Sequence, residues 1–237
     1  AVSVVGMSNG ASISRSGLQC IATMRSDAEI FLGIVGPIGS NRTILKTRLT
    51  EELKRYGYHL EDIHISKLVE KKSRKHGAET TCVGSVREYL ELFKKTHADL
   101  NPSDPCLELL RKMALCNHIC RLDDVNNRAA MIYYVVNEIS RIRTCLKRKK
   151  VRRIAYLVNQ LKRPEEVQAL RAIYGDAFFL IGLQTPEKQC LEQLQRRCLT
   201  EVEARRIYTW DQRDEDEFGQ RTSATFELAD IFIDVFD

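Results

Sequence analysis

Eight consecutive residues have the types and spacing of a loop that binds phosphate. Loops of the pattern Gly-x-x-x-x-Gly-Lys-Ser/Thr cradle phosphates because backbone N–H groups and a helix N-terminus face the anion, while the lysine and the hydroxyl contact the outer phosphates and magnesium. The corresponding residues here are Gly36, Pro37, Ile38, Gly39, Ser40, Asn41, Arg42 and Thr43. The spacing predicts a phosphate-binding loop, and the substitutions within it predict altered chemistry.

Two residues of this loop depart from the pattern. Asn41 replaces the second glycine and Arg42 replaces the lysine, although Gly39 keeps some backbone freedom. Asparagine tolerates a left-handed backbone, and arginine neutralises phosphate with a wider fork than an ammonium group. Phosphoryl transfer depends on accurate positioning by this lysine and its magnesium. The loop therefore predicts binding of a nucleotide with Mg²⁺ in preference to efficient catalysis, and a strand-to-helix turn without a ligand is the alternative.

The loop follows a continuous apolar run, residues 29–35, that is typical of a strand buried on both faces. Apolar residues at helical spacing come next, and residues 58–66 predict a second strand. Three more strands are predicted at 153–158, 177–183 and 230–234. Alternating strands and helices indicate an α/β fold with a doubly wound parallel sheet of about five strands.

Helical patterns fill most of the remaining chain. Residues 86–148 predict helices that cover the sheet and form a helical lobe, at about 84–148, beside it. Pro164 and Pro186 predict two helix starts, a last helix is expected at 201–206, and a charged loop at about 211–221. Residues 1–28, rich in Ser, Gly and Ala, predict a mobile arm before one domain at 29–237.

Composition narrows the class of protein. Hydrophobic residues make up 43% and charged residues 29% of the 237, and no apolar run is long enough to span a membrane. The eight cysteines are scattered, which favours free thiols in the cytoplasm. Much of the net charge of +5 lies between Arg141 and Arg153, where basic residues would attract phosphates.

Several segments resemble nucleoside monophosphate and dephospho-coenzyme A kinases. Residues 161–167 resemble their Arg-x-x-x-Glu segment, and residues 229–234 resemble their closing Ala-Asp-x-x-Ile-Asp strand. The resemblance implies a P-loop nucleotide-kinase fold with a lid, for which Arg205, Arg206 and Arg213 are the candidate arginines, with Asp211 and Asp214 as partners.

A closer resemblance is to the N-terminal domain of bacterial anti-phage dCTP deaminases. It rests on residues 33–40, 159–167, 174–181 and 213–217. It implies a regulatory nucleotide-binding domain in a defence enzyme that depletes dCTP, by conversion to dUTP, during phage infection. The implied partners are a (deoxy)nucleotide, a Zn²⁺-dependent deaminase domain of the same polypeptide, an inhibitory small RNA and further copies of the chain.

The zinc site of such a deaminase is not contained in this chain. Its signature is His-x-Glu with Pro-Cys-x-x-Cys, in which histidine and two cysteines hold the zinc. The chain has His59-Leu60-Glu61 and Pro105-Cys106, but position 109 is leucine. Cys116 and Cys120, spaced by one helical turn, have no second pair of ligands and favour a packed helix face. We expect no metal site and leave the catalytic residues unassigned.

Three single residues complete the candidates. Arg163 follows a strand end, where doubly wound sheets bind ligands, and is either a phosphate ligand or a support for the Pro164 turn. Arg128 is a weaker candidate contact for a monophosphate. Trp210 either stacks on a base or anchors the charged loop.

Two other functions remain open from the sequence. An active (deoxy)nucleotide kinase would use Arg42 in place of lysine. An oligomerisation or RNA-binding domain would use the basic run 141–153, although no aromatic platform accompanies that run.

Overall fold

Five parallel strands form one sheet in the computed structural model, which describes residues 29–75, 78–122 and 127–235. The predicted α/β class is confirmed, and the strand order β2-β3-β1-β4-β5 is consistent with a P-loop-like doubly wound fold. The strands are β1 (Glu29–Val35), β2 (His59–His64), β3 (Ile154–Asn159), β4 (Phe178–Gln184) and β5 (Ile231–Asp234). The predicted arm at 1–28 lies outside the described residues.

Helices connect the strands and also form a separate layer. Those in the described residues are α2 (Arg42–Arg55), α3 (Ile65–Lys75), α4 (Ala78–Thr96), α5 (Asp104–Leu122), α6 (Ala130–Arg148), α7 (Pro164–Tyr174), α8 (Glu187–Gln195), α9 (Glu201–Gln212) and α10 (Thr222–Phe226), with a 3-10 turn, η1 (Gly175–Ala177). As predicted, Pro164 occupies the first turn of its helix, where its missing N–H costs nothing.

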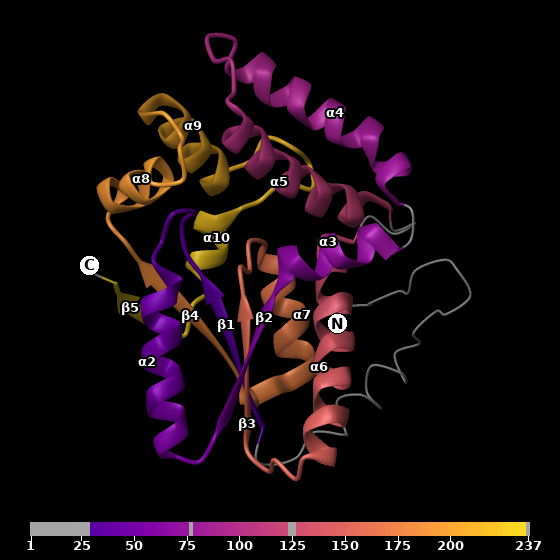
Figure 1. Ribbon diagram of the computed structural model, residues 1–237, viewed down its shortest axis with the longest axis vertical. Coiled ribbons are helices and arrows are strands. Elements are labelled where there is room, and N and C mark those ends of the chain that lie inside the picture. The colour runs from indigo at the N-terminus through magenta and orange to yellow at the C-terminus, as the bar shows by residue number, and fades with distance from the viewer. Residues whose placement is uncertain (1–28, 76–77, 123–126, 236–237) are drawn as a thin grey trace.

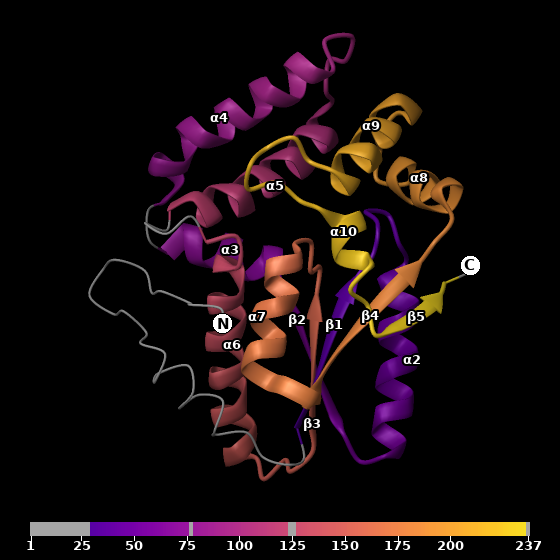
Figure 2. The ribbon, with the colours of Figure 1, turned by 180° about the vertical axis from the view of Figure 1, so that it is seen from behind.

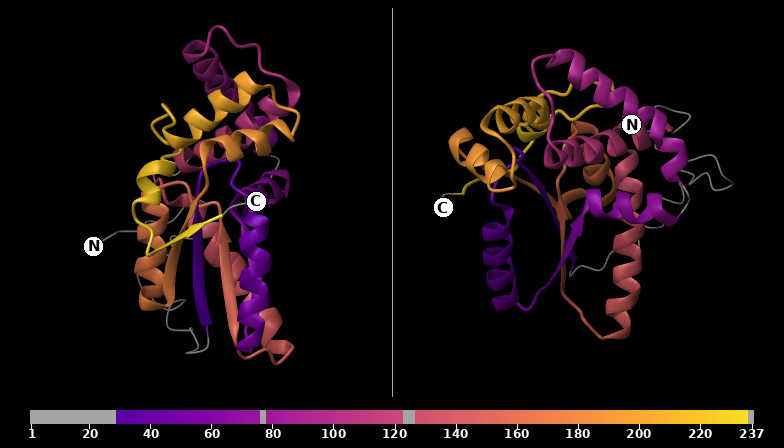
Figure 3. Two further views of the ribbon diagram at one scale, coloured as in Figure 1. Left: turned by 90° about the vertical axis from the view of Figure 1, so that its left-hand side faces the viewer. Right: turned by 45° about the horizontal axis from the view of Figure 1, so that its top comes forward.

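The two faces of the sheet carry different helices. Leu32 and Ile34 of β1 pack with Leu45 of α2, whereas Phe31 and Val35 of the same strand pack in a core that contains α6 and α7. Successive side chains of a strand point to opposite faces, so the unbroken apolar run of β1 supplies both cores. Figure 3 shows α2 and α7 on opposite sides of the strands, and Figure 2 shows α7 in front of them.

A second core joins four helices above the carboxyl ends of the strands. Apolar side chains of α4, α5, α8 and α9 pack together there, among them Phe93, Leu110, Leu194 and Trp210. Figure 1 shows these helices as a layer over the sheet. The predicted lobe at about 84–148 is thus divided, because α4 and α5 belong to this layer while α6 covers the sheet.

Three boundaries differ from the sequence expectation. The strand predicted at 58–66 ends at His64, and α3 begins at Ile65 because Ile65 and Val69, one helical turn apart, are both buried. Helix α9 continues through Asp211 to Gln212, where a loop was expected. A short helix, α10, follows that loop and was not predicted.

The connections after the neighbouring strands β1 and β3 run to opposite faces of the sheet. The chain leaves β1 toward α2 on one face and leaves β3 toward α7 on the other. Open α/β sheets bind ligands where adjacent connections diverge in this way, outside the carboxyl ends of the strands. The glycine loop 36–41 lies at this point.

Candidate phosphate-binding site

The loop between β1 and α2 is held in a tight turn by its own backbone. Ser40 N donates to the Pro37 carbonyl at 3.2 Å, and the Ser40 hydroxyl donates to the same oxygen at 2.8 Å. Gly39 has a φ of 91°, and a Cβ there would lie 2.4 Å from the carbonyl oxygen of Cys190 on α8. Only glycine fits a left-handed position this close to another backbone. The loop is therefore fixed against α8.

Arg42, the residue at the lysine position of the pattern, folds back onto the loop. Its Nη2 donates to the carbonyl oxygens of Pro37 at 3.2 Å and Gly36 at 3.4 Å, and its buried Nε has no hydrogen-bond partner. Burial lowers the pKa of this guanidinium, and the nearby Asp211 carboxylate opposes the shift. Asn41 directly precedes α2, whose first residue is Arg42. Thr43, the second residue of the helix, is exposed.

The lysine of the site comes from a different segment, the connection between β3 and α7. Lys162 is buried, and its Nζ donates to Gly36 O at 2.8 Å and to Asp211 Oδ2 at 2.9 Å. Burial lowers the pKa of Lys162 to about 8, against the attraction of Asp211. Sequence reasoning did not select Lys162 as a site residue. Its position three residues after the end of the buried strand β3 was the available signal.

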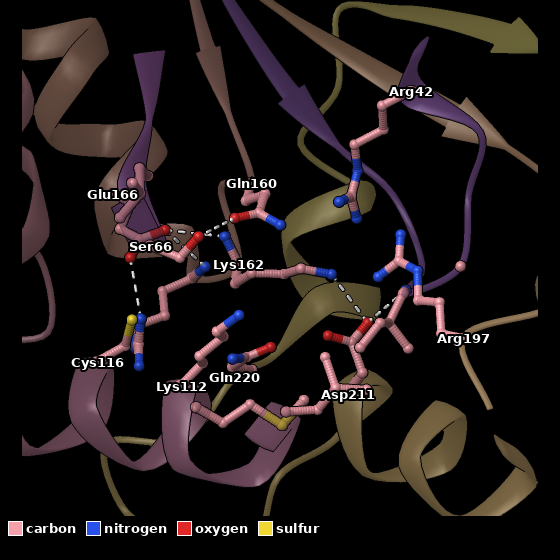
Figure 4. A pocket seen from close by; sticks show the side chains of 16 residues that line it. Arg42, Ser66, Lys112, Cys116, Gln160, Lys162, Glu166, Arg197, Asp211 and Gln220 are labelled. Carbon is pink, nitrogen blue, oxygen red and sulfur yellow. Dashed lines mark hydrogen bonds and ion pairs between the residues drawn. The ribbon is translucent and has the colours of Figure 1, made fainter. Parts of the chain in front are cut away.

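Asp211 brings a carboxylate to the same point from α9. The residue is fully buried, and Oδ2 accepts hydrogen bonds from the backbone N–H of Ile38 at 2.9 Å and from Lys162. Its other oxygen, Oδ1, is buried without a hydrogen-bond partner. Figure 4 shows the carboxylate between Lys162 and the loop, with Arg42 and Arg197 nearby. An oxyanion therefore already sits against a loop N–H group and the buried lysine.

These groups line one end of a cavity of about 100 Å³. The other end is formed by apolar side chains of α3 and α5, including Ile65 and Met113, and by the Ser66 hydroxyl, which donates to Gln160 Oε1 at 2.8 Å. Pockets that hold drug-sized ligands measure about 300–1,000 Å³. The cavity is smaller than this range, so a whole nucleotide would require its walls to move apart.

Arg163, the other predicted phosphate ligand, is among the residues that line the cavity, but its guanidinium is held by protein groups. Its Nη1 lies 3.0 Å from Glu166 Oε1, its Nη2 donates to Asn117 Oδ1 at 2.5 Å, and its Nε donates to Phe218 O at 2.9 Å. Only 2% of the residue is exposed. Each guanidinium nitrogen thus has a protein partner, and the side chain joins α7 to α5 and to the loop after α9.

The predicted lid arginines lie on or just after α9, away from the lining of the cavity. Arg205 pairs with Glu187 at 3.3 Å, and Arg206 pairs with Asp99 at 3.1 Å. Arg213 is exposed at the end of the helix. Among the arginines that do line the cavity, Arg197, which follows α8, was not selected from the sequence.

Two other candidate sequence features lie elsewhere. Arg128 pairs with Glu165 at 3.6 Å. The basic run reaches the C-terminus of α6 and the start of β3, at the end of the sheet opposite the loop (Figure 1), where Arg143 forms a bidentate pair with Glu29. Phosphate attraction by this run would therefore not act at the cavity.

Neither metal motif of the sequence forms a ligand cluster. His59 and Glu61 contact one another at 2.9 Å on β2, and Cys116 and Cys120 are buried free thiols of α5. Across residues 29–75, 78–122 and 127–235, no three His, Cys, Asp or Glu side chains are grouped so as to hold a metal ion.

Comparisons with known proteins give no family assignment. No family model matches this chain, and no curated protein matches it. In the described part of the chain, each helix is too short or too polar to cross a bilayer. The site itself combines a glycine loop, a helix N-terminus and several cationic side chains, among them Arg42, Lys162 and Arg197, at the switch point of a parallel sheet.

Proposed function

We propose that this domain binds a nucleotide through its phosphates at the loop 36–43. The bound nucleotide regulates another activity and is not a substrate for phosphoryl transfer. The observation that supports this is the convergence of three cations from separate segments on one cavity beside the loop: Arg42, Lys162 and Arg197. The same cavity is also lined by Lys112 and Arg163 and by two carboxylates, Glu166 and Asp211, so its lining has an excess of positive charge. A phosphate carries the opposite charge and accepts several hydrogen bonds, as such a site requires.

Several features argue against efficient phosphoryl transfer. Transfer needs a lysine and a magnesium ion positioned on the outer phosphates. Lys162 is engaged by Asp211, and Thr43, at the position of the magnesium ligand, is exposed. The buried end of β3 beside the loop carries Asn159, an amide, where a carboxylate would help to hold magnesium. These residues suit a ligand that is held and sensed.

The finer proposal is that the controlled activity is that of a defence dCTP deaminase in the cytoplasm. It is supported by the resemblance of residues 33–40, 159–167, 174–181 and 213–217 to the N-terminal domain of that family. The bound nucleotide would then be a deoxynucleotide of the pool that the deaminase depletes. A polypeptide carrying this domain would show dCTP deamination that responds to the nucleotide bound here.

Calorimetry with a panel of ribo- and deoxynucleoside mono-, di- and triphosphates, with and without Mg²⁺, tests the binding. We expect saturable binding that weakens at least about tenfold in Lys162→Gln, because a charge-assisted hydrogen bond is lost. Lys188→Gln, on the exposed side of α8, is the matched control and should bind as the wild type does. Absence of binding at millimolar ligand would refute the proposal.

An assay of phosphoryl transfer separates binding from catalysis. Labelled ATP is incubated with the protein, Mg²⁺ and deoxynucleoside monophosphates, and we expect no transfer above background. Transfer that disappears in Arg42→Ala would instead establish an active kinase that uses arginine at the lysine position.

A further inference from the structure

The Asp211 carboxylate occupies a position suited to a ligand phosphate. It accepts the Ile38 N–H at 2.9 Å and the Lys162 ammonium at 2.9 Å, and it lies in the cavity that Arg42 and Arg197 also line (Figure 4). Carboxylates and phosphates are both oxyanions that take backbone N–H and lysine donors. We propose that Asp211 is an internal competitor of the ligand: a phosphate binds by displacing this carboxylate, and the displacement moves the end of α9. The inference rests on the proposed function, because it concerns the same site.

The unpaired donors and acceptors of the cavity agree with an exchangeable arrangement. Asp211 Oδ1 and Arg42 Nε are both buried and lack hydrogen-bond partners, and Gln220 Oε1 is in the same condition. A buried polar atom without a partner costs about 1–3 kcal/mol. A phosphate has more acceptor positions than one carboxylate and could engage Arg42 as well as Lys162. Among these atoms Arg42 Nε is the unpaired donor, and a phosphate oxygen could accept its hydrogen bond, whereas Asp211 Oδ1 and Gln220 Oε1 are acceptors that a phosphate does not satisfy.

The position of Asp211 in the chain explains how the displacement would be transmitted. It is the residue before the last one of α9, and the loop after the helix is fixed to α4 and α5. Within that loop Asp214 accepts the Tyr89 hydroxyl at 2.6 Å, and Asp216 pairs with Arg121 at 2.6 Å. The proposed displacement of this carboxylate would rotate or shift the helix end to which this loop is joined.

The loop is also joined to the site at its other end. Arg221 N donates to the Lys162 carbonyl at 2.8 Å, so the segment 213–221 leaves α9 beside Asp211 and returns to the backbone of Lys162. One end of this segment is therefore joined to Asp211 through the chain, and the other end is hydrogen-bonded to Lys162, the partner of Asp211 in the buried ion pair. Separation of Lys162 and Asp211 would move the ends of this segment relative to one another. The conformation of 213–221 would therefore change when the site is occupied.

Trp210 provides an optical readout of this change. It is the only tryptophan of the sequence, it directly precedes Asp211, and its Nε1 donates to the Tyr89 hydroxyl at 2.6 Å. Inorganic tripolyphosphate is a suitable probe because it has no aromatic group that could absorb or stack. We expect its binding to change the emission of Trp210 in the wild type.

The decisive comparison is between Asp211→Asn and Glu201→Gln. Both changes remove one negative charge from α9, but Glu201 is exposed at the start of the helix and lies outside the phosphate end of the cavity. We expect Asp211→Asn to bind tripolyphosphate about tenfold more tightly or better than the wild type, because the competitor has lost its charge. Glu201→Gln should bind as the wild type does.

The outcomes separate this inference from the proposed function. If neither the wild type nor Asp211→Asn binds tripolyphosphate or nucleotide at millimolar concentration, both fail. If the wild type binds and a folded Asp211→Asn binds equally or more weakly, only the competition by Asp211 is refuted. If Asp211→Asn does not fold, hydrogen exchange of the wild type decides: faster exchange in 207–221 with tripolyphosphate supports displacement, and unchanged or slower exchange there refutes it.

Discussion

The phenol of Tyr89 on α4 donates a 2.6 Å hydrogen bond to Asp214, a buried carboxylate in the loop after α9. The same phenol oxygen accepts the indole N–H of Trp210 at 2.6 Å. One hydroxyl thus satisfies two buried polar groups, one near the end of α9 and one in the loop that follows the helix. Burial raises the pKa of Tyr89 well above its ordinary value, with the Asp214 charge acting in the same direction, so the phenol remains a donor.

Replacement of Tyr89 by phenylalanine should therefore destabilise the domain. Tyr89→Phe removes one acceptor and one donor while it keeps the ring, and we expect a loss of about 1–3 kcal/mol because both partners stay buried. Urea unfolding followed by circular dichroism measures it. Tyr56→Phe, at a residue that is 69% exposed, serves as the control and should change stability little. Equal stability of the two variants would contradict the role assigned to the Tyr89 hydroxyl.

The contact between the loop and α8 leads to a second prediction. Gly39→Ala would place a methyl group against the Cys190 carbonyl at a left-handed backbone position, so we expect a loss of at least about 2 kcal/mol. Gly84→Ala in α4 is the matched control. Nothing lies within 4 Å of a Cβ at Gly84, and alanine there should stabilise the helix by about 0.5–1 kcal/mol.

Thermal unfolding of the two variants distinguishes strain from a general intolerance of added methyl groups. Opposite shifts in melting temperature are the expected result. A Gly39→Ala protein as stable as the wild type would mean that the loop is free to move away from α8.

Much of the fold followed from the sequence because it depends on local patterns. The strands at 29–35 and 178–184 contain the continuous apolar runs 30–35 and 178–183, and Pro164 marks a helix start. The strand order is set by long-range pairing, yet the rules for parallel connections restrict it to few choices. The α3 boundary was missed because burial of Ile65 and Val69 outweighed a strand-like run that continues from β2.

The site was predicted only in part because its charged groups meet through tertiary structure. The loop 36–43 has a local signature, and it does lie at the switch point of the sheet. Lys162 and Asp211 are 49 residues apart and form an ion pair that no local pattern contains. Arg42 was assigned from the spacing of the loop and Arg163 from its position after a strand end, and neither signal reveals whether a guanidinium points to a cavity or to a carbonyl.

The low pKa of Lys162 leads to a pH dependence of binding. A phosphate binds the ammonium form, and the ligand-free lysine loses its proton as the pH rises through about 8, so affinity should fall as the pH increases. From about pH 7 to about pH 9 the charged fraction of a group with this pKa falls roughly tenfold, and the affinity should fall by up to that factor. The Cys190 thiol in the same region does not titrate in this range, because burial raises its pKa to about 11.

Calorimetry with tripolyphosphate across this pH range tests the dependence. Lys162→Met should bind weakly and with little change between the two pH values, since the titrating group is gone. A wild-type affinity that stays constant or rises with pH would show that Lys162 keeps its proton throughout. It would contradict the proposed link between deprotonation of Lys162 and loss of phosphate affinity.

Arg163 gives the last prediction, which separates a structural role from the ligand role that its position suggested. Arg163→Met leaves Glu166, 1% exposed, without its ion-pair partner, and loss of one member of a buried pair costs about 3–5 kcal/mol. Glu166 also accepts the backbone N–H of Lys162 at 2.8 Å, a contact that glutamine can keep. The double variant Arg163→Met/Glu166→Gln should therefore regain more than half of the lost stability in urea unfolding.

The affinity of the same variants for tripolyphosphate completes the test. The guanidinium nitrogens of Arg163 are taken by Glu166, Asn117 and Phe218, so a folded Arg163→Met protein should bind within about twofold of the wild type. A loss of tenfold or more at unchanged fold would make Arg163 a phosphate ligand in the bound state. That result would also require the α5 and 213–221 contacts of this side chain to open on binding, which hydrogen exchange in both segments would detect.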